Sequence, residues 1–212
     1  DNDGDMDAFV GASSPVSGGH RLKKNNGNGT FTDIAAGSGF DTTAYYNIEN
    51  VAHDFNNDGW VDVFGGNNTI MFNNGDMTFS PIQIPATNGP IGDLNNDGLL
   101  DIYNNNQVYF NIANDNNWIK VHLKGIASNS NGIGARVEVY TTTEGLEKQI
   151  RDVRSGDGFR YMSSLNAHFG LGAAETIEKV VVKWPSGTVD TILGPDINES
   201  LLVVEGEHVL AN

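Results

Sequence analysis

The sequence predicts an all-β protein in two parts: strand-turn-strand repeats first, then an antiparallel β-sandwich or barrel. Three observations support this prediction. Short runs of β-branched and aromatic residues alternate with turns rich in Gly and Asn. The chain has 26 glycines but only 6 prolines, as expected of many tight turns. An aspartate-rich motif recurs in the first half alone. The 212 residues suffice for two modest hydrophobic cores or one large one.

The composition excludes several classes of protein. The 27 acidic and 12 basic residues give a net charge of −15, which repels nucleic acid and anionic lipid and favours cations. The absence of cysteine excludes disulfides, zinc-thiolate sites and a cysteine nucleophile. No apolar run is long enough to predict a membrane span. Residues 1–115 contain 15 acids and 3 bases, whereas residues 116–212 contain 12 and 9, so we expect a domain boundary near Asp115.

The aspartate-rich motif occurs three times. Residues 54–62 (DFNNDGWVD) match residues 93–101 (DLNNDGLLD) position by position, and residues 1–7 (DNDGDMD) are the same motif without its first two positions. Each copy runs into a strand-like segment, followed by a second apolar pair and an Asn/Gly turn. The copies are separated by 55 residues from Asp3 to Asp58 and by 39 from Asp58 to Asp97. Periods in this range, with strand-turn-strand content, predict the blades of a β-propeller.

The motif favours a hard cation. Oxygen-bearing side chains at positions 1, 3, 5 and 9, a glycine at position 6 and the carbonyl group of position 7 suit an ion that takes six to eight oxygen ligands. Ten of the 27 acids lie in these three loops, and two carboxylates 4 Å apart repel by roughly 4 kcal/mol at an effective dielectric constant near 20. Ordinary Asp/Asn/Gly turns would explain one copy, but three in register favour metal binding. An EF-hand needs flanking helices and a Glu at position 12, where this chain has Gly65 and Asn104.

These loops resemble the calcium hairpins of FG-GAP/VCBS-type β-propeller repeats. The resemblance implies ligands at equivalent positions of each loop, with position 7 contributing its carbonyl group. They are Asp54, Asn56, Asp58, Trp60 and Asp62; then Asp93, Asn95, Asp97, Leu99 and Asp101; and, in the first loop, Asp1, Asp3, Asp5 and Asp7. The family has a further Asp two residues before Asp1. Three repeats do not close a propeller, so we expect residues 1–115 to be a fragment of a larger one, completed by upstream blades or by another chain.

In the second half, alternating apolar and polar residues predict longer strands, at residues 118–124, 135–140, 177–184 and 200–205. Three blocks of it resemble the ASPIC/UnbV domain, which commonly follows FG-GAP/VCBS repeats. They are Asn117-Trp118 with residues 131–137 (NGIGARV), residues 154–159 (RSGDGF) with 168–172 (HFGLG), and residues 182–187 (VKWPSG). The resemblance implies an ASPIC/UnbV-like β domain at residues 116–212, and it indicates architecture more than activity.

Other candidate sites are weaker. The five histidines have no metal-type spacing, and we interpret His168 as a structural residue that is hydrogen-bonded at a strand end. The arginines of residues 151–160 predict a solvated strand edge rather than a binding face. Trp60, Tyr45 and Tyr46 could stack on sugars, although core packing is the stronger interpretation.

We therefore expect a calcium-binding extracellular or cell-surface module for adhesion, matrix or surface/filament assembly. The expected partner is another protein or a second copy of the chain, without nucleic acid and without a membrane span. No Ser-His-Asp arrangement and no carboxylate pair outside the loops is recognisable, so we expect no enzymatic activity. The alternative is a carbohydrate-binding accessory module of a secreted enzyme, with a glycan as ligand.

Overall fold

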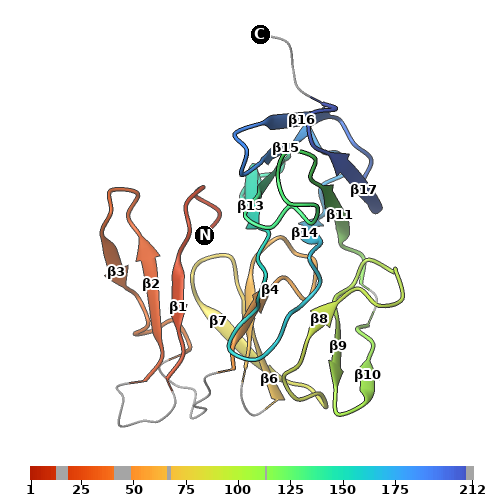
Figure 1. Cartoon of the computed structure of the whole chain (residues 1–212). Helices are drawn as coiled ribbons and strands as arrows, with labels where there is room; N and C mark the ends of the chain where they lie inside the picture. Colours follow the sequence, from red (N-terminus) through yellow and green to blue (C-terminus); the bar gives the residue numbers. More distant parts are fainter. Residues whose placement is uncertain (13–18, 41–48, 66–67, 113, 209–212) are drawn as a thin grey trace.

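The computed structural model describes residues 1–12, 19–40, 49–65, 68–112 and 114–208 of the chain. Within these residues the chain is almost entirely β-structure, and its strands form five sheets (Figure 1). Three small sheets hold the first half of the chain, and two further sheets pack together in the second half. The all-β fold predicted from the sequence is confirmed.

The three small sheets are antiparallel, and neighbours along the chain are neighbours in each sheet, as in propeller blades. The first contains β1 (Ala8–Val10), β2 (Arg21–Asn25) and β3 (Phe31–Asp33). The second contains β4 (Val51–His53), β5 (Asp62–Phe64), β6 (Thr69–Asn73) and β7 (Phe79–Gln83). The third contains β8 (Ile91–Gly92), β9 (Asp101–Asn104) and β10 (Gln107–Tyr109).

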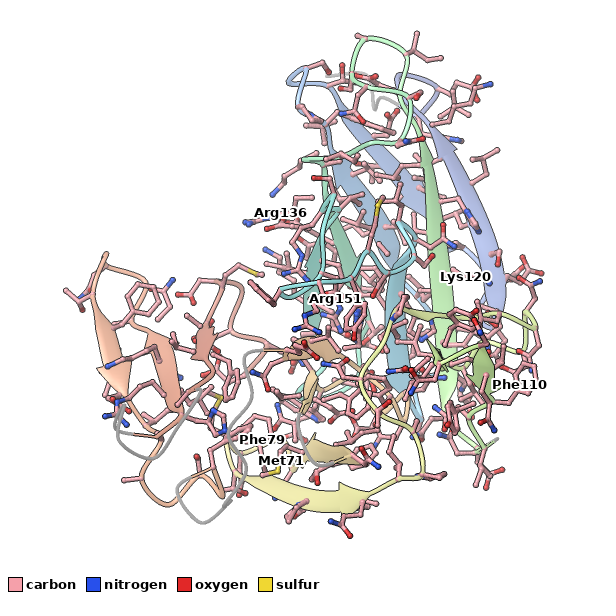
Figure 2. All side chains as sticks on the ribbon, turned by 60° about the horizontal axis from the view of Figure 1, so that its bottom comes forward. Met71, Phe79, Phe110, Lys120, Arg136 and Arg151 are labelled. Atoms are coloured by element: carbon pink, nitrogen blue, oxygen red, sulfur yellow. The ribbon has the colours of Figure 1, made fainter. Side chains whose placement is uncertain are left out.

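The two middle strands of the second sheet, β5 and β6, are buried on both faces, which explains their apolar pairs. Successive side chains of a strand point to opposite faces. On β5, Val63 packs in one cluster with residues of the first sheet, whereas Phe64 packs in another with residues of the third. On β6, Met71 packs in the cluster with the first sheet and Ile70 in the cluster with the third. Figure 2 shows Met71 close to Phe79 of β7, which belongs to the same cluster. Each apolar pair therefore holds one blade to both of its neighbours.

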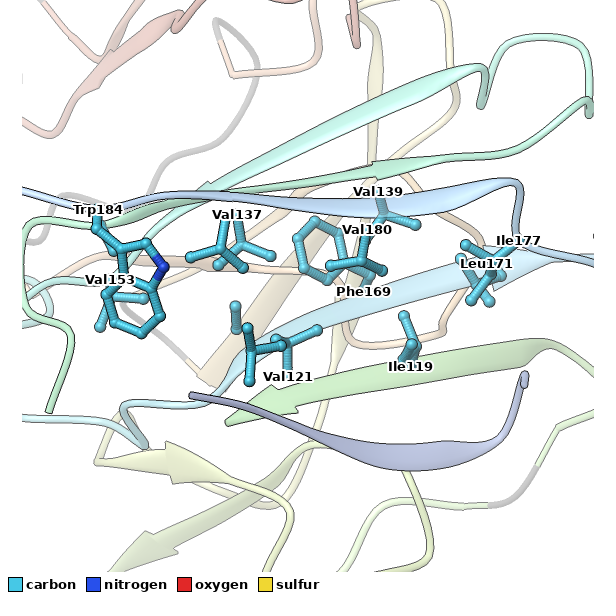
Figure 3. Packing of buried hydrophobic residues seen from close by; sticks show 14 of the residues in the cluster. Ile119, Val121, Val137, Val139, Val153, Phe169, Leu171, Ile177, Val180 and Trp184 are labelled. Carbon is cyan, nitrogen blue, oxygen red and sulfur yellow. The ribbon is translucent and has the colours of Figure 1, made fainter. Parts of the chain in front are cut away.

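The second half is a sandwich of two sheets. One has the strand order β14 (Ala167–Gly172), β11 (Asn117–Lys124), β17 (Glu199–Val204), and the other has the order β13 (Lys148–Asp152), β12 (Arg136–Tyr140), β15 (Lys179–Lys183), β16 (Val189–Leu193). Alternate residues of these strands fill the core between the sheets (Figure 3). The central side chains are Ile119, Val121, Val137, Val139, Phe169, Leu171, Val180 and Val182, all about 0 % exposed.

One pairing corrects the expectation of a purely antiparallel sandwich or barrel. Strand β17 pairs with β11 in parallel, from Ile119 opposite Glu199 to Lys124 opposite Val204. The physical reason is the connection: β17 follows β16 of the other sheet, so the chain enters by a crossover rather than by a hairpin, and crossovers permit parallel pairing. The four predicted strands match β11, β12, β15 and β17, while β13, β14 and β16 were not predicted as strands.

The sandwich core should dominate the stability of the second half. Phe169→Ala should lower the free energy of unfolding by about 3–5 kcal/mol, because the ring is fully buried between the two sheets. Phe159→Ala is the control, because that ring is 64 % exposed. Urea denaturation followed by tryptophan fluorescence measures both, and equal losses in the two variants would contradict the packing described.

Candidate metal centres

The three aspartate-rich loops share one backbone path. The fourth position of the motif is an asparagine with positive φ, and the sixth is a glycine with a larger positive φ. Asparagine tolerates the left-handed region better than most residues, and glycine adopts it without steric cost. The asparagines are Asn2, Asn57 and Asn96 (φ 56°, 58° and 61°), and the glycines are Gly4, Gly59 and Gly98 (φ 100°, 93° and 85°). The three copies are therefore equivalent in structure as well as in sequence.

The second loop is organised around Asp54, which follows β4 and is buried. Its Oδ2 accepts a hydrogen bond from the backbone N–H of Gly59 at 2.8 Å. Asn56 Oδ1 accepts from the N–H of Asp58 at 3.2 Å, and Asp58 Oδ1 accepts from the N–H of Trp60 at 2.8 Å. The other oxygen of Asp54, Oδ1, is buried without a hydrogen-bond partner. A buried carboxylate oxygen without a partner is costly unless a further group satisfies it.

The last aspartate of each loop joins the loop to the next strand. Asp62 accepts hydrogen bonds from the N–H groups of Phe55 and Asn73, each at 2.9 Å. In the third loop Asp101 accepts from Leu94 and Asn111, again at 2.9 Å. In the first loop Asp7 accepts from Asn25 at 2.8 Å. This aspartate therefore holds the fold of each blade, whatever else it binds.

The three asparagines of this contact were missed as site residues. Their side chains donate back to the carbonyl group of motif position 8, at 3.2 Å in each blade; the pairs are Asn25 with Met6, Asn73 with Val61 and Asn111 with Leu100. The recurring Asn after the second apolar pair could have revealed them, because only a polar residue with both a donor and an acceptor fits this position.

The loops are also linked to one another. The side chain of Asn2 donates to the carbonyl group of Gly59 in the second loop at 3.2 Å. The side chain of Asn57 donates in the same way to Gly98 in the third loop at 2.9 Å. Position 4 of one loop therefore contacts position 6 of the next. This relation was not predicted, because it joins residues that are 57 and 41 positions apart.

The sandwich packs directly on the second loop. His168 Nε2 lies 2.8 Å from Asn57 Oδ1, and the N–H of Gly172 donates to the carbonyl group of Asn57 at 2.8 Å. Because the amide nitrogen of Asn57 already donates to Gly98, its Oδ1 is the acceptor and His168 Nε2 carries the proton. Gly170 on β14 lies so close that a Cβ there would be 2.1 Å from Asp54 Oδ2. His168 is thus a buried structural residue, as expected from the sequence.

Burial raises the pKa of the enclosed carboxyl groups. It is the main cause that raises the pKa of Asp54 to about 7, with a further rise from the charge of Asp58 and opposition from Arg151. Burial, with the charge of Asp54, raises the pKa of Asp62 to about 8. Burial and the neighbouring charge of Arg151 lower the pKa of His168 to about 3, so its imidazole is neutral. Among the described residues, no lysine or arginine forms an ion pair with the carboxylates of the second loop, although the charge of Arg151 acts on Asp54.

Lysines contact the other two loops. Lys120 of β11 donates from Nζ to Asp93 Oδ2 at 2.7 Å in the third loop. Lys24 of β2 contacts Asp1 and lies 3.7 Å from Asp3 in the first loop. Asp5 Oδ1 in the first loop is buried without a hydrogen-bond partner, and burial followed by the charges of Asp3 and Asp7 raises the Asp5 pKa. The three loops are alike in backbone but differ in the charge beside them.

The second loop fits a hard divalent cation. Its donors are all oxygens, from aspartate, asparagine and a main-chain carbonyl group, which Ca²⁺ prefers. The unpartnered Asp54 Oδ1 supplies a buried acceptor among them. Within the described ranges, no three His, Cys, Asp or Glu side chains converge as a ready-made metal site. The aspartates instead face backbone N–H groups of their own loops.

The family models agree with both halves. Residues 1–65 and 54–104 match the FG-GAP-like repeat, and residues 125–209 match the ASPIC and UnbV model. The chain carries FG-GAP-like repeats followed by an ASPIC/UnbV domain. No curated protein matches the chain. The FG-GAP repeats are typical of surface or extracellular proteins. No helix among the described residues is long and apolar enough to cross a bilayer.

A polar contact between the repeats and the ASPIC/UnbV domain was also missed. His53 of β4 lies 2.6 Å from Asp157 Oδ2. Asp157 is buried, yet hydrogen bonds from His53 and Ser163 outweigh the burial and lower its pKa. In a nucleophilic triad the histidine bonds the serine, whereas here the aspartate bonds both. This trio therefore joins the domains and does not have the geometry of a serine nucleophile.

Of the three aromatic candidates for sugar stacking, Trp60 alone lies among the described residues. The ring of Trp60 packs close to Gly75 and Gly145, where added Cβ atoms would lie 3.1 and 3.2 Å from it. Tyr45 and Tyr46 lie outside the described residues. Arg151, expected on a solvated strand edge, instead lies inward beside Asp54 and over the ring of Phe169 at 5.1 Å.

Gly170 should be essential to the contact between the second loop and the ASPIC/UnbV domain. Gly170→Ala should destabilise the protein and increase hydrogen exchange in residues 54–62, because the new Cβ would overlap Asp54 and Asn57. Gly156→Ala is the matched control, because no atom lies within 4 Å of a Cβ at that position. Equal effects of the two substitutions would contradict this close packing.

The free energy of unfolding of the metal-free protein should depend on pH because the carboxyl groups of Asp54 and Asp62 are buried. The folded-state pKa values of Asp54 and Asp62, about 7 and 8, exceed the unfolded value. The folded state then binds more protons, so this contribution to stability is present below about pH 4 and is lost as pH rises to about 8. Urea denaturation in a chelator should show this decline, and Asp54→Asn should reduce it. A stability that rises throughout this window would contradict the shifts.

Proposed function

We propose that the chain is a calcium-binding extracellular module for adhesion, matrix or surface/filament assembly. The second loop is its principal site. Asp54, Asn56, Asp58 and Asp62 would hold the ion with the carbonyl group of Trp60. The observation that carries the proposal is the buried, unpartnered Oδ1 of Asp54 within this set of oxygens. A bound Ca²⁺ would supply the positive charge that these carboxylates lack.

The site supports a structural role because of what surrounds it. Asp62 joins the loop to β6 through Asn73, Asn57 joins it to the third loop, and β14 of the ASPIC/UnbV domain packs on it. An ion that fixes this loop would stabilise the contact between the repeats and the following domain. Binding to the folded state alone contributes about 2.7 kcal/mol per site at a hundredfold excess of calcium over Kd. A stiff, two-domain surface is suited to contact another protein or a second copy of the chain.

The proposal does not include catalysis. The one Ser, His and Asp trio described lacks triad geometry. Nor do we adopt the carbohydrate-binding alternative, because Trp60 packs against two glycines and forms no open platform.

Calcium binding should depend on the second loop. Isothermal titration calorimetry should detect saturable Ca²⁺ binding, and Asp58→Ala should abolish the tightest site because it removes a proposed carboxylate ligand at position 5 of the motif. Asp196→Ala, at an exposed residue far along the chain, is the control and should bind as the unmodified protein does. Unchanged binding in the Asp58 variant, or no binding in the unmodified protein, would refute the proposal.

Chelation should affect both domains where they meet. We expect residues 1–115 to lose hydrogen-exchange protection first, because all three loops lie there. The amide of Gly172 should lose protection with them, because it donates to Asn57 of the second loop. The amide of Val139, inside the sheet of β12, should stay protected. Hydrogen exchange with and without EGTA tests this, and uniform change across both domains would contradict it.

The assembly part of the proposal has its own test. Sedimentation velocity of the full chain in millimolar calcium and in EGTA should show larger species only with calcium. A monodisperse monomer under both conditions would exclude self-assembly of this chain.

A further inference from the structure

The third loop holds a buried ammonium group that the second loop lacks. Lys120 Nζ lies 2.7 Å from Asp93 Oδ2 and 3.1 Å from Asn96 Oδ1. The side chains of Lys120 and Asp93 are only 4 % and 1 % exposed. Asp93 occupies position 1 of the motif, as Asp54 does in the second loop. The ammonium group of Lys120 therefore lies beside Asp93, the first proposed metal ligand of the third loop.

The two loops are contacted by a matched pair of residues. Lys120 on β11 and His168 on β14 are directly opposite each other in the sheet. Each contacts the position-4 asparagine of one loop. Lys120, labelled in Figure 2, donates to Asn96 Oδ1 in the third loop. His168 Nε2 lies 2.8 Å from Asn57 Oδ1 in the second loop. The geometry of contact is thus repeated, while the chemistry differs. At this position the second loop meets a neutral imidazole, with the charge of Arg151 nearby but no ion pair to Asp54 among the described residues, whereas the third meets an ammonium group in direct contact.

This difference changes the charge that a metal ion would encounter. Each loop carries three aspartates, at positions 1, 5 and 9. In the third loop one of these charges is compensated by Lys120 in a protected environment, where the interaction is weakly screened by solvent and salt. In the second loop Asp54 Oδ1 has no hydrogen-bond partner. A divalent ion in the third loop would also be repelled by the ammonium group beside Asp93.

We propose that Lys120 is a resident cation of the third loop that lowers its calcium affinity relative to the second loop. The inference rests on the proposed calcium binding and adds a ranking: the second loop fills first, and the third fills only at higher calcium concentrations. The ASPIC/UnbV domain, through one strand residue, thereby sets the affinity of a site that lies in the repeats. Two loops with nearly the same sequence become sites of different affinity.

A structural role alone makes the opposite prediction. If Lys120 only joined the two domains, its removal would loosen the third loop and weaken metal binding there. If it competes with the metal, its removal strengthens binding at the third loop, even where the metal-free protein becomes less stable. Metal affinity therefore separates the two roles, and stability does not.

The test is Tb³⁺ titration of the full chain, followed by tryptophan-sensitised luminescence, with Ca²⁺ calorimetry alongside. Trp60 lies in the second loop, and the ring of Trp118 packs on Gly98 of the third, so both loops have a nearby donor. Asp58→Asn and Asp97→Asn assign the binding phases to the two loops. The unmodified protein should bind at least tenfold more weakly at the third loop than at the second.

Lys120→Met should tighten the third-loop phase at least tenfold and leave the second-loop phase unchanged. Lys120→Gln, which keeps a hydrogen-bond donor without the charge, should act in the same direction and serves where the Met variant does not fold. Lys120→Arg, which keeps the charge, should not tighten it. Lys124→Met, at the exposed end of the same strand, is the matched control.

The outcomes distinguish the inference from the proposed function. An unchanged or weakened third-loop phase in Lys120→Gln, with normal binding at the second loop, would overturn the role of Lys120 and leave calcium binding intact. Equal affinities of the two loops in the unmodified protein would do the same. No saturable binding to the unmodified protein would overturn both.

Discussion

The burial of aspartate at the junction of two domains is the constraint on which the rest of this structure depends. Asp54 is enclosed by its own loop and by β14, with Gly170 in van der Waals contact. A carboxylate in such a place must be compensated, because the loss of hydration is not offset by one or two hydrogen bonds. Three factors compensate the buried charge of Asp54 in part: a hydrogen bond from the N–H of Gly59, the positive charge of Arg151, and a raised pKa that favours the neutral acid. A bound cation would compensate the charge that is left.

The same loops organise the repeats. The aspartate at position 9 fixes the following strands, the asparagine at position 4 reaches the next loop, and the apolar pairs behind them fill the clusters between sheets. Hydrogen bonds of Asn57 therefore connect the second loop both to the third loop and to strand β14 of the sandwich.

The sandwich contacts the loops and strands of the repeats through polar side chains. Strands β11 and β14 of the sandwich present Lys120 and His168 to the third and second loops, and Asp157 bonds His53, the residue before the second loop. A cluster of acidic loops thus contacts basic and imidazole groups from the part of the chain that carries most of the positive charge.

The sequence by itself determined the all-β class, the repeated loops with their glycine turns, and four strands of the sandwich. These features are local: period-two alternation, turn chemistry and the order of residues within one motif depend on residues within about ten positions of one another. Only the tertiary structure decided the parallel entry of β17, the inward position of Arg151 and the different neighbours of Asp54 and Asp93. Those contacts join residues far apart in the sequence, 27 positions in the case of Lys120 and Asp93. A motif that has the same aspartates in two loops contains no information about which side chain the fold will place beside each.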